Sequence, residues 1–174
     1  MADPCLIWFT GLPGSGKTTL ASAMTESMRS RGLSVLHLDG DRFRQGVSSD
    51  LGFSEQDRFE NLRRVAEVAK LALEQEVWVV ASFVSPFRAG RAQVETLIEP
   101  FRHLEIHLDC SLSECQRRDP KGLYRKAQQG QLQQLTGFSA PFEAPLSPAL
   151  QLNSEHLSVE ECLTGLEQLL EQFL

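Results

Sequence analysis

The sequence predicts an α/β protein: a three-layer α/β/α sandwich around a mainly parallel sheet of five strands, formed by one domain over residues 1–174. Short apolar runs alternate with longer stretches whose apolar residues recur at helical spacing, which is typical of βαβ units. A chain of 174 residues with 41% hydrophobic residues can bury such a core without disulfide bonds. Ligands of these sheets bind beyond the carboxyl ends of the strands.

Four of the five strands can be assigned from continuous apolar runs. The first run is continuously apolar, as expected of a strand covered by helices on both faces, and the later runs repeat that character. They lie at residues 6–9, 35–38, 77–81 and 104–108.

Three stretches are candidate helices, at residues 18–31, 54–75 and 158–173. The first ends at Gly32, the second begins with Ser54, a favourable N-cap, and the second and third carry apolar residues at helical spacing. Residues 119–148 interrupt the alternation of apolar runs and helical stretches, because they are rich in Gln, Gly and Pro. Structureless segments of this length in compact domains are commonly functional, so we expect a mobile lid, with an ordinary surface loop as the alternative.

The composition argues against several partners and compartments. The net charge of −6 does not favour a nucleic-acid or membrane surface. The four cysteines show no paired C-x-x-C spacing, so we expect reduced, buried thiols and a cytoplasmic protein. The sequence also shows no signal-peptide pattern and no apolar run of membrane-spanning length.

The strongest functional signal is GLPGSGKT at residues 11–18, which fills the phosphate-loop pattern G-x-x-x-x-G-K-[ST] directly after the first apolar run. Such a loop turns backbone N–H groups and the positive end of a helix toward phosphates. A simple Gly-rich turn would not need both Lys17, which adds a charge near the β- and γ-phosphates, and Thr18, whose hydroxyl can ligate Mg²⁺. The predicted ATP-binding residues are Gly11, Leu12, Pro13, Gly14, Ser15, Gly16, Lys17, Thr18 and Thr19.

Polar residues also follow the next two strands. Asp39 and Asp41 come after the second run, and residues 85–88, SPFR, come after the third, bringing a hydroxyl and a guanidinium to the same edge. A kinase for an alcohol needs a carboxylate to orient or accept the hydroxyl proton. The alternative for Asp39 and Asp41 is a solvated turn, because Asp-Gly is common in turns.

Basic residues gather around the start of the long helix at residues 54–75, where acidic residues would be preferred. They suggest an anion site made by Arg44, Arg58, Asn61 and either Arg63 or Arg64. Arg58 and Asn61 are three apart and share a helix face. An exposed basic helix face is the competing interpretation.

Together these motifs resemble the adenylylsulfate kinase family. The stretches GLPGSGKTT, LDGDRFR, LGFSEQDRFENLRRVAEVAK, SFVSPFRAGR and RDPKGLYRKAQQG, with TGF and PFEAP, follow the family's order and spacing over residues 5–153. The resemblance implies a P-loop kinase of sulfate assimilation, a homodimer that uses ATP and Mg²⁺ to phosphorylate the ribose 3′-hydroxyl of adenylylsulfate. The alternatives are a P-loop kinase with another small acceptor and a nucleotide-binding regulatory module with little turnover.

The resemblance also implies individual roles. Lys17, Asp41 and Ser85 fall on catalytic positions, and Thr18 and Asp39 on metal positions. Ser85 matches a serine recorded in the family as a phosphoserine, although direct transfer between two bound nucleotides needs no such intermediate. Arg118 falls beside the ATP base. The substrate positions are Asp39, Asp41, Arg44, Phe53, Arg58, Asn61, Ser85, Pro86, Lys121, Leu135 and Phe138.

Two departures from the family pattern lie beside the expected substrate. Leu135 stands where the family commonly has Phe, so the second wall over the substrate adenine becomes Leu135 unless Phe138 replaces it. Asp41 is followed by Arg42 and Phe43 where the pattern often has Asn-Val. Because an aromatic wall contributes about 1 kcal/mol beyond its buried area, we expect weaker substrate binding with intact chemistry.

Overall fold

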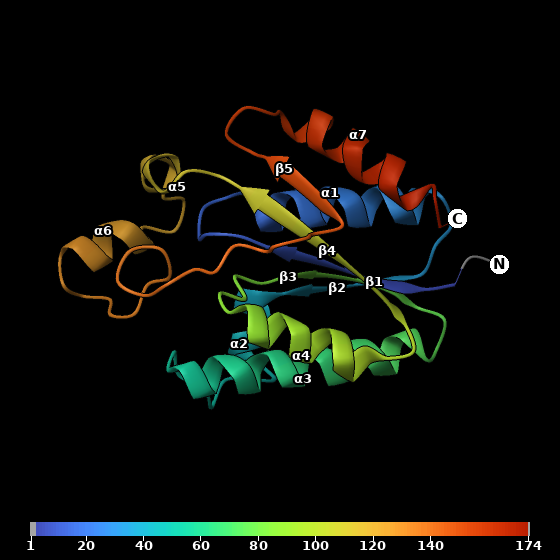
Figure 1. The fold of residues 1–174 in the computed structure, drawn as a ribbon, viewed down its shortest axis with the longest axis horizontal. Helices are drawn as coiled ribbons and strands as arrows, with labels where there is room; N and C mark the ends of the chain where they lie inside the picture. Colours follow the sequence, from blue (N-terminus) through green and yellow to red (C-terminus); the bar gives the residue numbers. More distant parts are fainter. Residues whose placement is uncertain (1–2, 174) are drawn as a thin grey trace.

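The computed structural model describes residues 3–173 and contains a five-stranded sheet between two layers of helices (Figure 1). The strands are β1 (Cys5–Thr10), β2 (Val35–Asp39), β3 (Trp78–Ser82), β4 (Arg102–Asp109) and β5 (Leu150–Asn153). Their order is β2-β3-β1-β4-β5, and every pairing is parallel. The predicted α/β/α class is confirmed, and β5 is the edge strand that no apolar run revealed.

Helices α1 and α7 cover one face of the sheet, whereas α3 and α4 cover the other (Figure 1). The helices are α1 (Lys17–Ser30), α2 (Gly40–Gln45), α3 (Glu55–Leu73), α4 (Arg88–Ile98), α5 (Leu112–Arg118), α6 (Leu123–Gln128) and α7 (Val159–Leu170). The three predicted helices correspond to α1, α3 and α7, with ends that differ by at most three residues. The Ser54 side chain caps α3, as predicted, by accepting a hydrogen bond from the Asp57 N–H.

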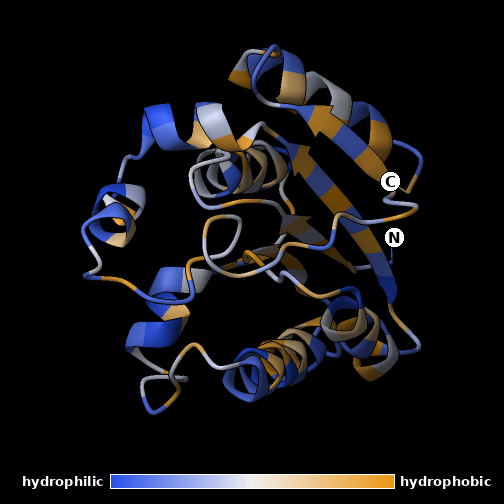
Figure 2. Ribbon diagram, turned by 60° about the vertical axis from the view of Figure 1, so that its left-hand side comes forward, coloured by the Kyte–Doolittle hydropathy of each residue, from blue (hydrophilic) through white to orange (hydrophobic). Residues whose placement is uncertain are grey.

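The central strand β1 divides its side chains between two hydrophobic cores. Ile7 and Phe9 point toward α1 and α7, whereas Leu6 and Trp8 point toward α3 and α4. All six residues of β1 are buried, which explains why the strand has no polar alternation. In Figure 2, hydrophobic and hydrophilic colours alternate along β4 and β5, and hydrophilic colour dominates on α5 and α6.

Helices α5 and α6 lie beyond the carboxyl ends of the strands (Figure 1), where the predicted lid at residues 119–148 begins. The segment has structure of its own, because Tyr124 and Leu135 form a small core with Cys110 and Cys115. The movement of this segment as a lid stays a prediction.

The four cysteines are free and buried, as the sequence analysis predicts. Across residues 3–173, no helix combines the length and the apolar character needed to cross a lipid bilayer.

The phosphate loop begins at a close approach to the sheet that only glycine permits. A Cβ at Gly11, where φ is +152°, would lie 2.7 Å from the Leu108 carbonyl oxygen of β4. Gly32 also has a positive φ, +82°, but nothing lies within 4 Å of the corresponding Cβ. Gly32 is therefore a matched control for backbone strain without a steric clash.

We expect Gly11→Ala to lower the free energy of unfolding by about 1–3 kcal/mol more than Gly32→Ala does, because overpacking adds to the backbone cost in the first variant alone. Urea unfolding of both variants measures the difference. Equal losses would show that the Leu108 contact is not a rigid constraint.

Candidate active site

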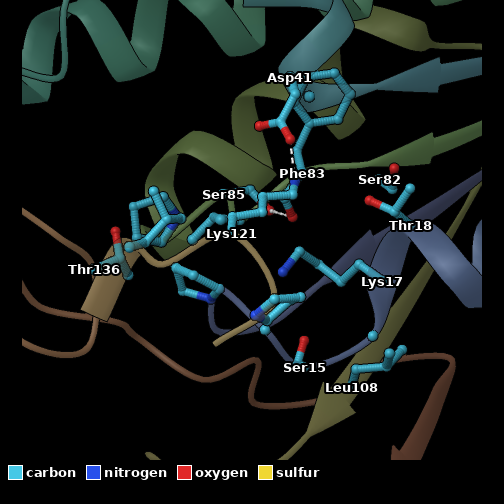
Figure 3. A pocket seen from close by; sticks show the side chains of 18 of the residues that line it. Ser15, Lys17, Thr18, Asp41, Ser82, Phe83, Ser85, Leu108, Lys121 and Thr136 are labelled. Atoms are coloured by element: carbon cyan, nitrogen blue, oxygen red, sulfur yellow. Dashed lines mark hydrogen bonds and ion pairs between the residues drawn. The ribbon is translucent and has the colours of Figure 1, made fainter. Parts of the chain in front are cut away.

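A cavity of about 720 Å³ lies at the carboxyl ends of the central strands (Figure 3). It is lined by the phosphate loop, the β2–α2 turn, the start of α3, the β3–α4 loop, the segment around α6 and the β5–α7 loop. The predicted catalytic, metal, ATP and substrate residues line it except Gly11, Leu12 and Phe138; the basic residues Arg63, Arg64 and Arg88, predicted beside them, do not line it. The topology thus gathers residues from across the chain into one space.

The phosphate loop presents an uncapped helix start and a buried ammonium group to this cavity. No side chain caps the first turn of α1, and Gly16 adopts a left-handed conformation immediately before it. Lys17 is buried, and its Nζ donates to the Gly11 carbonyl at 2.9 Å and the Leu12 carbonyl at 2.7 Å. Burial lowers the Lys17 pKa to about 8. The unpaired N–H groups and this charge are suited to bind phosphate.

Oxygen ligands suitable for a hard cation lie beside the loop. The Asp39 carboxylate accepts hydrogen bonds from the Thr18 hydroxyl at 2.9 Å and the Ser82 hydroxyl at 3.3 Å. Burial acts to raise the Asp39 pKa, but the Thr18 hydroxyl, backbone N–H groups of α2 and the Lys121 charge outweigh it and lower the pKa. Residues 3–173 contain no cluster of three or more His, Cys, Asp or Glu side chains that could hold a metal. The site fits Mg²⁺, which commonly uses few protein carboxylates together with phosphates and water.

Asp41 forms an ion pair with Lys121, which reaches across the cavity from the segment between α5 and α6 (Figure 3). Both side chains are about half exposed, at 58% and 52%. The pair connects the predicted base to the predicted lid directly.

A second cationic site surrounds Phe53. The Arg44 guanidinium lies 4.4 Å from the centroid of the Phe53 ring, and that of Arg58 lies 5.7 Å from it. Within the described part of the chain neither arginine pairs with a carboxylate; Arg44 donates to the Gly52 carbonyl, and Arg58 to the Phe53 and Gln134 carbonyls. Burial lowers the pKa of both guanidinium groups. Two such cations beside an exposed ring are suited to an anion with an attached aromatic group.

The predicted basic cluster is smaller than the sequence suggested. Arg63 pairs with Glu60 at 2.8 Å, and Arg64 pairs with Asp50 at 2.6 Å, because the turn of α3 directs both away from the cavity. The Arg88 guanidinium does not line the cavity either, and its Nε donates to the Ala144 carbonyl at 2.8 Å. These predictions of anion-facing arginines were wrong.

Ser85 is buried, and its hydroxyl already has partners. Its Oγ accepts a hydrogen bond from the Trp8 indole N–H at 3.0 Å and donates to the Thr10 hydroxyl at 2.9 Å. The Thr10 hydroxyl in turn donates to the Val84 carbonyl at 2.8 Å. Ser85 has a φ of 40°, a strained value for a residue other than glycine. The hydroxyl therefore forms part of a network that fixes the β3–α4 loop.

The two candidates for the second adenine wall lie in different environments. Leu135 is 7% exposed, packs with Tyr124 and Cys115, and lines the cavity. Phe138 is 42% exposed and lies outside the cavity lining. In this conformation Leu135, rather than Phe138, borders the cavity.

No sequence pattern predicted the β5–α7 loop as part of the site, but its residues Ser154 and Leu157 line the cavity together with Val159, the first residue of α7. Arg118 donates to the Ser154 carbonyl at 2.7 Å, and the Ser154 hydroxyl donates to the Ser15 carbonyl at 2.7 Å. These small and apolar residues carry no motif. Only the pairing of β5 with β4 brings them beside the phosphate loop.

Comparison with known proteins agrees with this geometry. Residues 3–153 match the family model described as adenylylsulphate kinase. The adenylyl-sulfate kinase of Geotalea uraniireducens is 48% identical over 169 residues, covering 97% of this chain and 81% of the relative. The adenylyl-sulfate kinase of Pseudomonas entomophila is 49% identical over 158 residues, covering 91% of this chain and 76% of the relative. The APS kinase CysC of Mycobacterium tuberculosis, solved with AMPPNP and APS, superposes with a TM-score of 0.94 at 38% identity, covering 98% of this chain and 99% of that one. The chain belongs to the adenylylsulfate kinase family.

Proposed function

We propose that this protein is an ATP-dependent adenylylsulfate kinase, which transfers the γ-phosphoryl group of ATP to the ribose 3′-hydroxyl and yields 3′-phosphoadenylylsulfate and ADP. The main supporting observation is one cavity that joins a phosphate loop to a second cationic site built from Arg44, Arg58 and Phe53. Such a cavity suits two nucleotides, of which the acceptor carries an anionic group and a flat base. Membership of the family identifies that acceptor as adenylylsulfate.

ATP binds with its phosphates against the uncapped start of α1 and the Lys17 ammonium. The Thr18 hydroxyl and the Asp39 carboxylate would hold Mg²⁺, which supplies positive charge to the β- and γ-phosphate oxygens when bound. Arg118 and the β5–α7 loop border the same end of the cavity and are suited to the adenine.

The acceptor nucleotide lies on the opposite side, with its anionic groups on Arg44 and Arg58 and its base against Phe53. Asp41 orients the 3′-hydroxyl and accepts its proton as the phosphoryl group moves. Lys121 has three N–H donors, so it can serve both Asp41 and a phosphate oxygen. Asn61, whose buried Oδ1 has no partner among the described residues, offers a further acceptor for this nucleotide.

The proposal includes direct phosphoryl transfer without a phosphoserine. The Ser85 hydroxyl is held by Trp8 and Thr10, and within residues 3–173 no carboxylate or imidazole is bonded to it that could remove its proton. Positioning and charge stabilisation account for most phosphoryl-transfer catalysis, so Ser85 serves as a fixed wall of the site.

The protein is further proposed to act as a homodimer in the cytoplasm. Its four buried free thiols are compatible with a reducing compartment, and the family resemblance supports the dimer.

ADP release from ATP and Mg²⁺, measured with and without adenylylsulfate, tests the proposed function. We expect release to depend on adenylylsulfate and ³¹P spectra to show a new 3′-phosphomonoester. ADP release at the same rate without adenylylsulfate, or a higher kcat/KM with another alcohol, would contradict the assignment.

The lowered pKa of Lys17 predicts a pH-dependent affinity for ATP. Phosphate binds the ammonium form, and this form is lost as the pH rises through about 8, so affinity falls toward alkaline pH. Between pH 7 and pH 9 the Kd should rise about tenfold. Calorimetric titrations should show this slope in the wild type and a flat profile in Lys17→Met; the same slope in both would exclude Lys17 as its source.

Asp41→Asn should lower kcat by a factor on the order of 100 or more, because an amide cannot accept the hydroxyl proton. The Kd for ATP should change little. Steady-state kinetics and ATP titration measure the two quantities. A fall in ATP affinity with unchanged kcat would instead indicate that Asp41 acts on the metal.

Ser85→Ala separates a structural hydroxyl from a covalent relay. The substitution leaves the Trp8 indole N–H without its acceptor, so we expect a loss of about 1–3 kcal/mol in the free energy of unfolding. Phosphoryl transfer should remain substantial below the melting temperature. A variant that folds and binds both nucleotides but has no turnover would refute direct transfer.

A further inference from the structure

Two segments far apart in sequence lie side by side at the wall of the cavity. The acceptor loop, residues 83–87, joins β3 to α4 and contributes Ser85 and Pro86 to the lining. The return segment, residues 140–145, follows the lining residues Leu135 and Thr136 and leads the chain back toward β5. The two are joined by polar contacts that neither the phosphate loop nor the cationic site uses.

Glu143 attaches the return segment to the acceptor loop and to the first two turns of α4. Its backbone N–H donates to the Pro86 carbonyl at 2.8 Å. Its carboxylate accepts the Arg88 backbone N–H at 2.7 Å, at the start of α4, and its carbonyl accepts an Arg91 Nη2 hydrogen bond at 2.8 Å. The carboxylate bond to an uncapped helix start is charge-assisted and hence stronger than a neutral one.

Arg91 connects three parts of the fold through one guanidinium group. It is 4% exposed, donates through Nη1 to the Ser85 carbonyl at 2.7 Å, and pairs through Nε with Glu105 of β4 at 2.6 Å. Its second Nη reaches Glu143 of the return segment. A planar guanidinium has a fixed donor geometry, so these bonds set the position of Ser85 relative to the return segment.

The energetics of this arrangement favour positioning over bulk stability. Desolvation offsets most of what a buried ion pair such as Arg91 and Glu105 gains from its attraction. Arg91 also donates a hydrogen bond to the carbonyl of Ser85. The φ of Ser85, 40°, is strained, so this residue needs contacts from its surroundings to hold its conformation. The main effect of these hydrogen bonds is therefore to fix the position of the residues that line the cavity.

We propose that Arg91 and Glu143 are positioning residues for the acceptor nucleotide. They fasten the acceptor loop to the return segment, so that the wall made by Ser85 and Pro86 keeps a fixed separation from the wall made by Leu135. Neither makes a hydrogen bond to the phosphate loop or the β5–α7 loop, so their loss affects the acceptor and spares ATP. This inference rests on the proposed function, which names the acceptor.

Glu143→Ala tests the inference, with Glu143→Gln as the rescue, because a glutamine oxygen can still accept the Arg88 N–H. Glu167→Ala is the control for general destabilisation, since it removes a carboxylate that holds Ser27 and Arg31 on the other side of the sheet. Calorimetry gives the Kd for adenylylsulfate in the presence of ADP, and separately the Kd for ADP with Mg²⁺.

We expect Glu143→Ala to weaken adenylylsulfate binding about tenfold, the scale of one charge-assisted hydrogen bond, and to raise its KM with kcat nearly unchanged. ADP affinity should stay within about twofold, and Glu143→Gln should restore adenylylsulfate binding. Arg91→Lys keeps the charge opposite Glu105 but not both carbonyl contacts, and should give the same selective loss.

Unchanged adenylylsulfate affinity in Glu143→Ala would overturn the inference. Equal weakening of both nucleotides, or a selective loss that also appears in Glu167→Ala, would overturn it as well. A wild-type protein that binds ADP but no adenylylsulfate would contradict the proposed function itself, which distinguishes the two failures.

Discussion

The site depends on the parallel pairing of β1 with β3. Their register sets Phe9 opposite Ser82, so the two strands end at the same level. The phosphate loop leaves the end of β1, and the acceptor loop leaves the end of β3. Two side-chain bonds, from Trp8 to the Ser85 hydroxyl and from Thr10 to the Val84 carbonyl, hold these exits together. The donor and acceptor halves of the cavity therefore share one rigid support.

Around that support, the site contains several features that are unfavourable for the stability of the folded protein. Lys17 is a buried ammonium whose pKa is lowered to about 8, Arg44 and Arg58 have no carboxylate partner among the described residues, and Ser85 has a left-handed φ. Each feature costs stability in the empty protein. The three cations also match a ligand with several negative charges, because bound anions offset the cost of desolvating Lys17, Arg44 and Arg58. Functional sites commonly concentrate strain and perturbed groups in this way.

Most of the fold could be predicted from the sequence because burial on both faces leaves a continuous apolar run, as in β1 and β3. Strand β5 could not be, since it is a short edge strand in which only Leu152 is buried. The phosphate loop, Asp39 and Asp41 were found from local patterns that carry their own chemistry. Arg63, Arg64 and Arg88 were misassigned because composition does not show which way a helix turns a side chain. The β5–α7 loop stayed hidden because only strand order brings it to the cavity.

The contacts of Arg91 and Glu143 likewise could not be predicted from any local sequence pattern. Glu143 lies more than 50 residues from Arg88 and Arg91 in sequence, and a surface arginine or glutamate looks the same in a sequence. Only the packed fold shows that both end on the acceptor loop. Long-range polar contacts of this kind are the part of a site that structure adds to motif analysis.

The steric course of phosphoryl transfer tests the account most directly. ATP made chiral at its γ-phosphorus would be turned over with adenylylsulfate, and the configuration of the 3′-phosphate would be determined. A single direct transfer between two nucleotides held in one cavity, with Ser85 as a fixed wall, predicts inversion. Retention would require two successive displacements and would contradict the account.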